Sequence, residues 1–117
     1  MKETVLLRIN TMVKHIDSVM DNAYNLTIEQ LEKSEVLLKA TCFSIMQIGE
    51  MMIQLEKHLG PYYKDLPWAD ARGMRNRVAH DYTNIDVFDV YETIHKDLIP
   101  LKEKFLEIKE DIKNHDC

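Results

Sequence analysis

Three arginines and a histidine between positions 72 and 80 could act together on a phosphate group. Arg72, Arg75 and Arg77 are three of the four arginines in a chain whose formal net charge is −5. Guanidinium groups stay charged and offer a planar set of N–H donors to phosphate oxygens. The cluster therefore predicts an anionic partner. The contact must be local, because an acidic chain cannot neutralise many phosphates at once.

The cleavage of RNA without a metal ion suits these residue types. The reaction needs a base for the 2′-hydroxyl proton, an acid for the leaving 5′-oxygen and positive charge beside the pentacoordinate phosphorane. Histidine exchanges protons near neutral pH, and arginine supplies the charge. We therefore predict Arg75 and His80 as catalytic residues, Asn76 as a support that orients the imidazole, and Arg72 and Arg77 as contacts to RNA phosphates.

The candidate residues fall on one predicted helix, at about residues 68–81. Pro67 suits the start of that helix, and its core-facing stripe would be formed by Ala71, Met74 and Val78. On a regular helix Arg75 and His80 lie about 140° apart. One copy therefore aims them poorly at a shared atom unless the helix frays near His80. A second, two-fold related copy could complete the site, so we predict a dimer.

A structural role for the same residues is the competing interpretation. An arginine and a histidine at this spacing form a weak pattern when they stand alone. Arg75 and His80 could instead form surface ion pairs with Asp70 or Asp81.

Apolar residues recur every three or four positions in the other long segments of the chain. The pattern predicts helices over 3–20, 34–59, 86–94 and 100–114. Thr27 and Gln30 can form a capping box between the first two, and Asp86 can cap the third. Gly60 in a left-handed conformation with Pro61 can end the second, and Pro100 can kink or restart the chain. The last helix would place Leu101, Phe105, Ile108 and Ile112 on one apolar stripe. The sequence therefore predicts one all-α domain over residues 1–117, with no second domain.

The sequence offers little support for a metal centre, a disulfide or a membrane anchor. Its histidines are scattered without regular partners, so we expect no metal ion and no cofactor. Cys42 and Cys117 read as reduced thiols. We found no uncharged apolar run of about 18 residues or more, which predicts a soluble, unsecreted, cytoplasmic protein without a membrane partner.

Two further residues favour a structural interpretation. Glu50 lies in the apolar central helix, where we expect it to pair with an arginine or tyrosine of the same chain. Trp68 could stack on a base, but a tryptophan next to Pro67 at a helix start is more typical of a packing anchor.

A set of short motifs resembles one family in the same order. They are Ile48-Gly49-Glu50, Leu66-Pro67-Trp68, Gly73-Met74-Arg75-Asn76, Val78-Ala79-His80-Asp81-Tyr82 and Asp97-Leu98. Between about residues 34 and 106 the chain is similar to HepT-like proteins of the HEPN superfamily, whereas the N-terminal third matches only in its amphipathic pattern. The resemblance implies an up-and-down bundle of four to five helices that forms a two-fold dimer.

The resemblance also implies an activity and its control. HepT-like proteins resemble dimeric, metal-independent ribonucleases with an R-x4-6-H motif, which Arg75 and His80 match at the four-residue spacing, with Asn76 in the usual polar position. The family implies a toxin of a type VII-like toxin–antitoxin system that cleaves RNA such as tRNA. A minimal nucleotidyltransferase antitoxin would neutralise it by attaching AMP to Tyr82, which fits an R-x4-H-x-Y pattern.

Two other functions stay open on the sequence alone. A non-catalytic HEPN module could use the arginines to bind a nucleotide or a nucleotidyltransferase partner. A purely structural helical adaptor could use them as a docking patch without any nucleotide.

Overall fold

Helices make up nearly all of the described chain. The structure is a computed structural model that describes residues 2–81 and 85–114, with the side chains of 79–81 left aside. Its elements are α1 (Lys2–Ala23), α2 (Ile28–Lys33), α3 (Glu35–Leu59), α4 (Trp68–Asp81), α5 (Val87–Glu92), a π-helical turn (Thr93–Asp97) and α6 (Leu98–Asn114). The last three follow one another without a break. The described residues thus form five helices, which confirms the all-α prediction.

Local capping signals explain where several helices begin. The Thr27 hydroxyl accepts a hydrogen bond from the Gln30 amide at 3.1 Å, and the Gln30 side chain accepts one from the Thr27 amide at 2.8 Å. This confirms the predicted capping box. Asp86 caps α5, as predicted, and Ser34 caps α3. Each such cap stabilises a helix start by about 1 kcal/mol.

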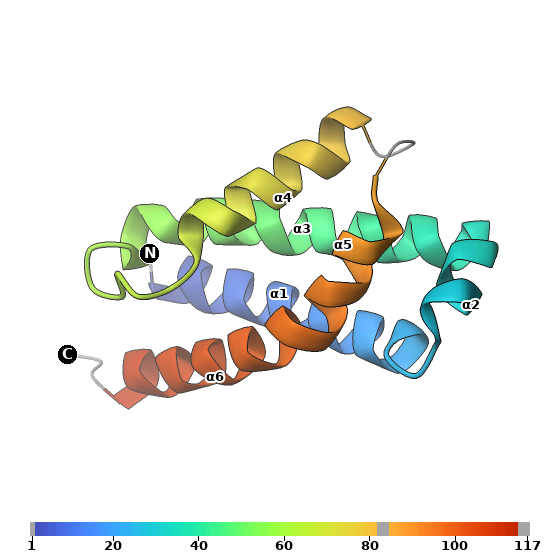
Figure 1. Ribbon diagram of the computed structural model, residues 1–117. Helices are drawn as coiled ribbons and strands as arrows, with labels where there is room; N and C mark the ends of the chain where they lie inside the picture. Colours follow the sequence, from blue (N-terminus) through green and yellow to red (C-terminus); the bar gives the residue numbers. More distant parts are fainter. Residues whose placement is uncertain (1, 82–84, 115–117) are drawn as a thin grey trace.

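The four long helices run in alternating directions. Figure 1 shows α3 in the middle, with α1 along one side and α4 along the other, and with α6 beside α1. The start of α1 and the end of α6 lie at the same end of the bundle. The arrangement is the predicted up-and-down bundle, while the two-fold dimer stays a prediction.

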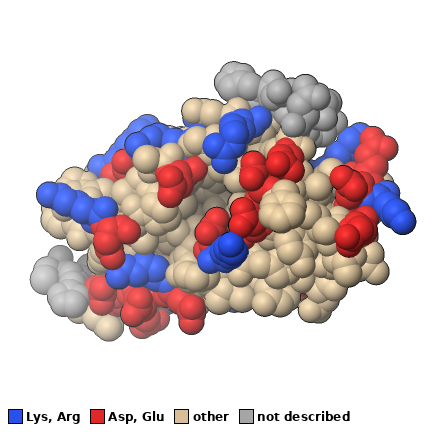
Figure 2. Space-filling view, viewed as in Figure 1, with Lys and Arg blue, Asp and Glu red and all other residues tan. Residues whose placement is uncertain are grey.

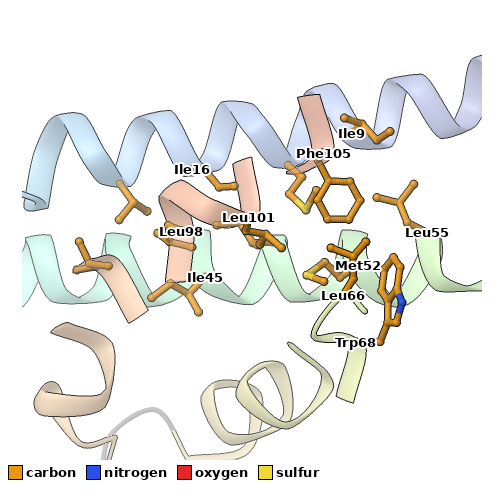
Figure 3. Close-up of a cluster of buried hydrophobic side chains, with 14 of the residues drawn as sticks. Ile9, Ile16, Ile45, Met52, Leu55, Leu66, Trp68, Leu98, Leu101 and Phe105 are labelled. Atoms are coloured by element: carbon orange, nitrogen blue, oxygen red, sulfur yellow. The ribbon is translucent and has the colours of Figure 1, made fainter. Parts of the chain in front are cut away.

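The core lies between α1, α3 and the α5–α6 run. Phe105 is fully buried at its centre, and the predicted apolar stripe of α6 is confirmed because Leu101, Phe105 and Ile108 all point inward. Figure 3 shows these contacts, with side chains that include Ile9, Ile16, Ile45, Met52, Leu55, Leu66, Trp68, Leu98, Leu101 and Phe105.

The α3 helix is long and apolar enough, by length and composition, to cross a membrane. A core helix of a soluble protein has the same properties. In this fold α3 packs against α1 and α4, and it buries residues along its length from Thr41 to Leu59. Its apolar character is therefore explained by its central position.

Three local predictions are corrected by the structure. α1 continues to Ala23, beyond the predicted end at Met20. Gly60 is right-handed, with φ −53° and ψ −46°, so its predicted left-handed conformation is wrong. Pro100 does not restart the chain, because α6 begins at Leu98. The preceding π-helical turn offers a wider spacing of backbone bonds, which accommodates a residue that cannot donate one.

Candidate functional site

The α4 helix that carries the candidate residues is anchored at both ends. The Pro67 carbonyl accepts a hydrogen bond from the Ala71 amide at 3.1 Å, which places Pro67 at the helix start as predicted. The Trp68 indole donates to the Tyr63 carbonyl at 2.9 Å and packs edge-on against Phe105. Val78 is buried near the other end. Trp68 is therefore the packing anchor that its position predicts.

A glycine on α3 lets α4 come unusually close. A Cβ atom placed on Gly49 would lie 2.8 Å from the Arg75 Cβ and 3.1 Å from the Ala71 carbonyl oxygen. Real Cβ atoms essentially never approach another heavy atom to 2.8 Å. The bare backbone of Gly49 is thus what allows the stem of Arg75 to lie across α3.

Arg75 is held by a carboxylate of α3. Its Nη1 lies 3.3 Å from Oε2 of Glu50, and the two side chains are 32% and 37% exposed. The Arg75 Nε is buried and has no hydrogen-bond partner among the described residues. The expectation that Glu50 pairs with an arginine or a tyrosine is confirmed. The partner of Arg75 is Glu50, where the structural interpretation expected Asp70 or Asp81.

Arg72 forms a second ion pair between the same two helices. Its Nη1 contacts Oε1 of Glu56, and both side chains are partly exposed. Arg72 and Arg75 therefore both direct their guanidinium groups toward carboxylates of α3. Asn76, the predicted support, is exposed on α4.

Arg77 points away from the other two arginines. Its polar contact within the described residues is a weak one, from Nη2 to the Met74 sulfur at 3.8 Å. Arg77 lines a cleft, whereas Arg72 and Arg75 do not line it. The three arginines thus do not form a single surface patch in one copy of the chain.

The cleft lies between α4 and the α5–α6 run, with α3 as its floor. It has a volume of about 920 Å³, and its apolar floor includes Ile48 and Met52. Figure 2 shows the hollow, with acidic side chains along the edge formed by α5 and the π-helical turn.

The rim of this cleft carries an excess of acidic groups. Burial, reinforced by repulsion from Asp70 and Glu92, raises the pKa of Asp97. Lys96 offsets part of this charge, because its Nζ pairs with Glu92 at 2.8 Å, but four carboxylates line the cleft against two cationic side chains. The cleft is therefore a poor place for a phosphate backbone, and the α3 side of α4 is the better candidate.

His80 is in the last turn of α4, and Tyr82 follows that helix in the sequence. The backbone of α4 is helical through Asp81, so His80 belongs to its last turn and the helix does not fray before it. The side chain of His80 is not among those that the structure describes. Tyr82 lies outside the described residues altogether.

A metal centre does not emerge from the described residues. No group of three or more histidine, cysteine, aspartate or glutamate side chains there is arranged to hold a metal ion. The described side chains of the site include the guanidinium groups of Arg72 and Arg75 and the carboxylates that hold them.

The comparison with known proteins places the chain in a family. The family model described as Ribonuclease HepT-like matches residues 11–108. The chain belongs to the HepT-like ribonuclease family. The match covers α4 completely, and it also includes most of the N-terminal third, which the motifs alone did not reach.

Relatives of this HepT-like chain carry ribonuclease names. A Methanocaldococcus jannaschii protein named "Putative RNase MJ1216" is 24% identical over 105 residues, covering 90% of this chain and 87% of the relative. A Thermococcus cleftensis protein named "Probable ribonuclease HepT" is 27% identical over 75 residues, covering 61% and 68% of the two chains. No solved structure matches the chain significantly.

Glu50 and Gly49 are the site residues that sequence reasoning placed outside the functional set. The motif Ile48-Gly49-Glu50 was visible in the sequence, but its contact with Arg75 depends on how α3 crosses α4. A glycine next to a glutamate within an apolar helix was the available signal.

Proposed function

We propose that this HepT-like protein is an endoribonuclease that cleaves RNA such as tRNA, without a metal ion and at a site shared by two copies of the chain. The family supports ribonuclease activity. The observation that carries the proposal is the regular helix of α4 through Asp81, which separates Arg75 from His80 by about 140° around the helix. One copy then supplies only half of the required geometry.

The proposed reaction is a transphosphorylation. One His80 removes the proton from the 2′-hydroxyl, the 2′-oxygen attacks the phosphorus, and the 5′-oxygen leaves with a proton from the second His80. The products are a 2′,3′-cyclic phosphate and a 5′-hydroxyl. Arg75 stabilises the negative charge of the phosphorane, and Asn76 orients the imidazole. Arg72 would bind a flanking phosphate on the α3 side of α4, and Arg77 would bind one outside the acidic cleft that it lines.

A cleavage assay in EDTA tests this proposal. His80→Ala should lower the rate by roughly 10² to 10⁴-fold, because it removes both the acid and the base. Arg75→Ala should lower it to a similar extent. His58→Ala and Arg8→Ala serve as matched controls and should cleave normally. The mechanism would be wrong if both His80→Ala and Arg75→Ala still cleave RNA, or if EDTA abolishes cleavage by the wild type.

The shared site makes dimerisation a requirement. Because the proposed reaction uses the His80 of both copies, an excess of His80→Ala protein mixed with the wild type should lower the wild-type rate as mixed dimers form. Light scattering should give the mass of two chains. An active protein that stays monomeric at assay concentration would contradict the two-copy site.

A non-catalytic binding module is the second candidate, and one observation favours it. Arg75 and Arg72 are already paired with Glu50 and Glu56 in the free chain. Such a module would bind a nucleotide or a nucleotidyltransferase partner through the arginines and would not need His80. Binding that depends on Arg75 but not on His80, without cleavage, would support this candidate.

We also propose that the protein is a cytoplasmic toxin of a type VII-like toxin–antitoxin system. A minimal nucleotidyltransferase would transfer AMP from ATP to the phenol oxygen of Tyr82, with pyrophosphate as the leaving group. The added phosphodiester carries a negative charge two positions after His80, and it would compete with RNA for the arginines.

Mass spectrometry after incubation with such a nucleotidyltransferase and ATP tests this regulation. The expected result is an AMP adduct on the wild-type chain and none on Tyr82→Phe, together with loss of RNA cleavage in the modified protein. Tyr91→Phe is the control that should still be modified. An adduct that persists in Tyr82→Phe would show that another residue is the acceptor.

A further inference from the structure

Two ion pairs join α3 to α4, and they differ in their surroundings. Arg72 pairs with Glu56, and Arg75 pairs with Glu50. All four side chains are between 32% and 44% exposed. Such partly exposed pairs add little to stability. A role beyond stability is therefore worth seeking for the pair whose surroundings are more specialised.

The ion pair of Arg75 with Glu50 lies where α4 comes very close to the backbone of α3, at Gly49. Gly49 leaves room for the Arg75 Cβ and Cγ, which would lie 2.8 and 3.4 Å from a Cβ at that position. The stem of Arg75 is therefore fixed against the backbone of α3, and its Nε is buried. The three atoms nearest to a Cβ on Gly49 belong to Arg75 and Ala71, and none belongs to Arg72.

Glu50 then decides where the free end of Arg75 points. With the stem and Nε enclosed, the remaining freedom lies in the direction of the two terminal nitrogens. The Nη1 of Arg75 lies 3.3 Å from Glu50 Oε2, which is longer than the 2.7 to 2.9 Å that is usual for a tight charged hydrogen bond. The contact is thus close enough to orient the guanidinium group toward Glu50.

We propose that Glu50 is a positioning residue, which holds the Arg75 guanidinium over Gly49 in the orientation that stabilises the phosphorane. This inference rests on the proposed ribonuclease function. Glu50 does not touch the RNA; it acts through Arg75. An arginine that is already oriented loses less conformational freedom when the transition state forms, so the benefit appears in the catalytic rate.

The kinetic signature of such a role is specific. Removing the carboxylate should lower kcat without raising KM, because a negative charge close to the site does not help the substrate to bind. We expect Glu50→Ala to lower kcat roughly 10- to 30-fold, which is the range that the lost orientation of a single long side chain can explain. Glu50→Gln should retain more activity than Glu50→Ala, since its amide oxygen can still accept from Arg75.

The matched control is Glu56→Ala, which removes the carboxylate that pairs with Arg72 between the same two helices. It should leave kcat within about twofold of the wild type. The melting temperature and the mass in solution should be unchanged, within a few degrees, in all three variants. Wild-type kcat in Glu50→Ala would overturn the inference. An equal loss of kcat in Glu56→Ala would overturn it as well, because it would indicate a general effect of helix pairing.

Arg75→Ala separates this inference from the function on which it rests. If Arg75→Ala is inactive while Glu50→Ala keeps the wild-type kcat, the positioning role is wrong and the ribonuclease proposal stands. If Arg75→Ala cleaves RNA as well as the wild type, the proposed site itself is wrong, and the role of Glu50 is overturned with it.

Discussion

The contact between Gly49 and Arg75 leads to a sharp prediction about two glycines. Gly49 and Gly73 both lie inside helices, and neither has a positive φ. Replacing a glycine inside a helix by alanine normally stabilises the helix by about 0.5 to 1 kcal/mol. The structure predicts that the two positions will respond with opposite signs.

The difference follows from what the new methyl group would meet. At Gly73 the nearest atom is the flexible Arg77 Nη1 at 3.7 Å, which is ordinary contact. We expect Gly73→Ala to gain the full 0.5 to 1 kcal/mol or so. At Gly49 the methyl group would meet the Arg75 Cβ at 2.8 Å and the Ala71 carbonyl at 3.1 Å. Neither atom can turn aside, because each is tied to the α4 backbone.

Overpacking of this kind costs about 1 to 3 kcal/mol, which exceeds the gain in helix propensity. Gly49→Ala should therefore be destabilised by roughly 1 kcal/mol, or about 4 °C in the melting temperature, while Gly73→Ala melts a few degrees higher than the wild type. Thermal unfolding followed by circular dichroism measures both. It should be repeated at several protein concentrations, because dimerisation would make the melting temperature depend on concentration.

The same pair of variants separates stability from activity. Gly49→Ala should also lower the rate of RNA cleavage, since the displaced α4 carries Arg75 with it. For Gly73→Ala the prediction concerns the melting temperature alone. A Gly49→Ala protein that is as stable as Gly73→Ala would show that α3 and α4 are not in the close contact described here. The account of Arg75 would then have to be abandoned.

Two further predictions concern titratable groups. Cys42 is 2% exposed, and burial raises the pKa of its thiol. In a Cys117→Ser variant, which leaves Cys42 as the one thiol of the chain, a thiol reagent should react only as fast as the protein unfolds. Rapid labelling of the native variant would contradict this burial. Burial, together with Asp70 and Glu92, raises the pKa of Asp97 in the folded state, so its contribution to stability falls as the pH rises from the ordinary aspartate range. Asp97→Asn should therefore be more stable than the wild type near pH 7, by less than about 1 kcal/mol in the free energy of unfolding, and should have the higher melting temperature. The difference should shrink below about pH 4, and equal melting temperatures at neutral pH would count against the repulsion.

Much of the fold could be predicted from the sequence because its signals are local. The capping box at Thr27 and the cap at Asp86 involve residues two or three positions apart, and both were confirmed. The bounds of α4 were predicted correctly for the same reason, since Pro67 and the apolar stripe are visible in a short window. Local chemistry determined these helix starts.

The predictions for Pro100 and Gly60 were wrong because neighbouring segments determine the conformation at these two residues. Pro100 alone suggests a break, but the π-helical turn before it lets the chain continue into α6. Gly60 can adopt a left-handed conformation, and here it remains right-handed. In both cases the residue type allows more than one outcome, and packing selects among them.

The site was only partly predictable, for a different reason. The helical period predicts the angle between Arg75 and His80, but it says nothing about a partner on another helix. Glu50 was expected to pair with an arginine or a tyrosine, and the identity of that residue depends on the crossing of α3 and α4 at Gly49. This crossing follows from contacts between segments more than twenty positions apart, which no periodicity encodes.

The distribution of charge around α4 bears on which anion the site can bind. On one side Arg75 and Arg72 face Glu50 and Glu56, and on the other side Arg77 lines a cleft with an acidic rim. Each arginine of a single copy therefore has acidic neighbours, and the chain as a whole carries a charge of −5. A small anion would gain little from any one of these guanidinium groups, because it would have to compete with a nearby carboxylate. A polyanion that meets the arginines of two copies at once makes several such contacts together, and their combined strength can exceed the competition. If two copies pair as proposed, the contact with RNA should stay confined to these arginines, because the acidic remainder of each chain repels a phosphate backbone.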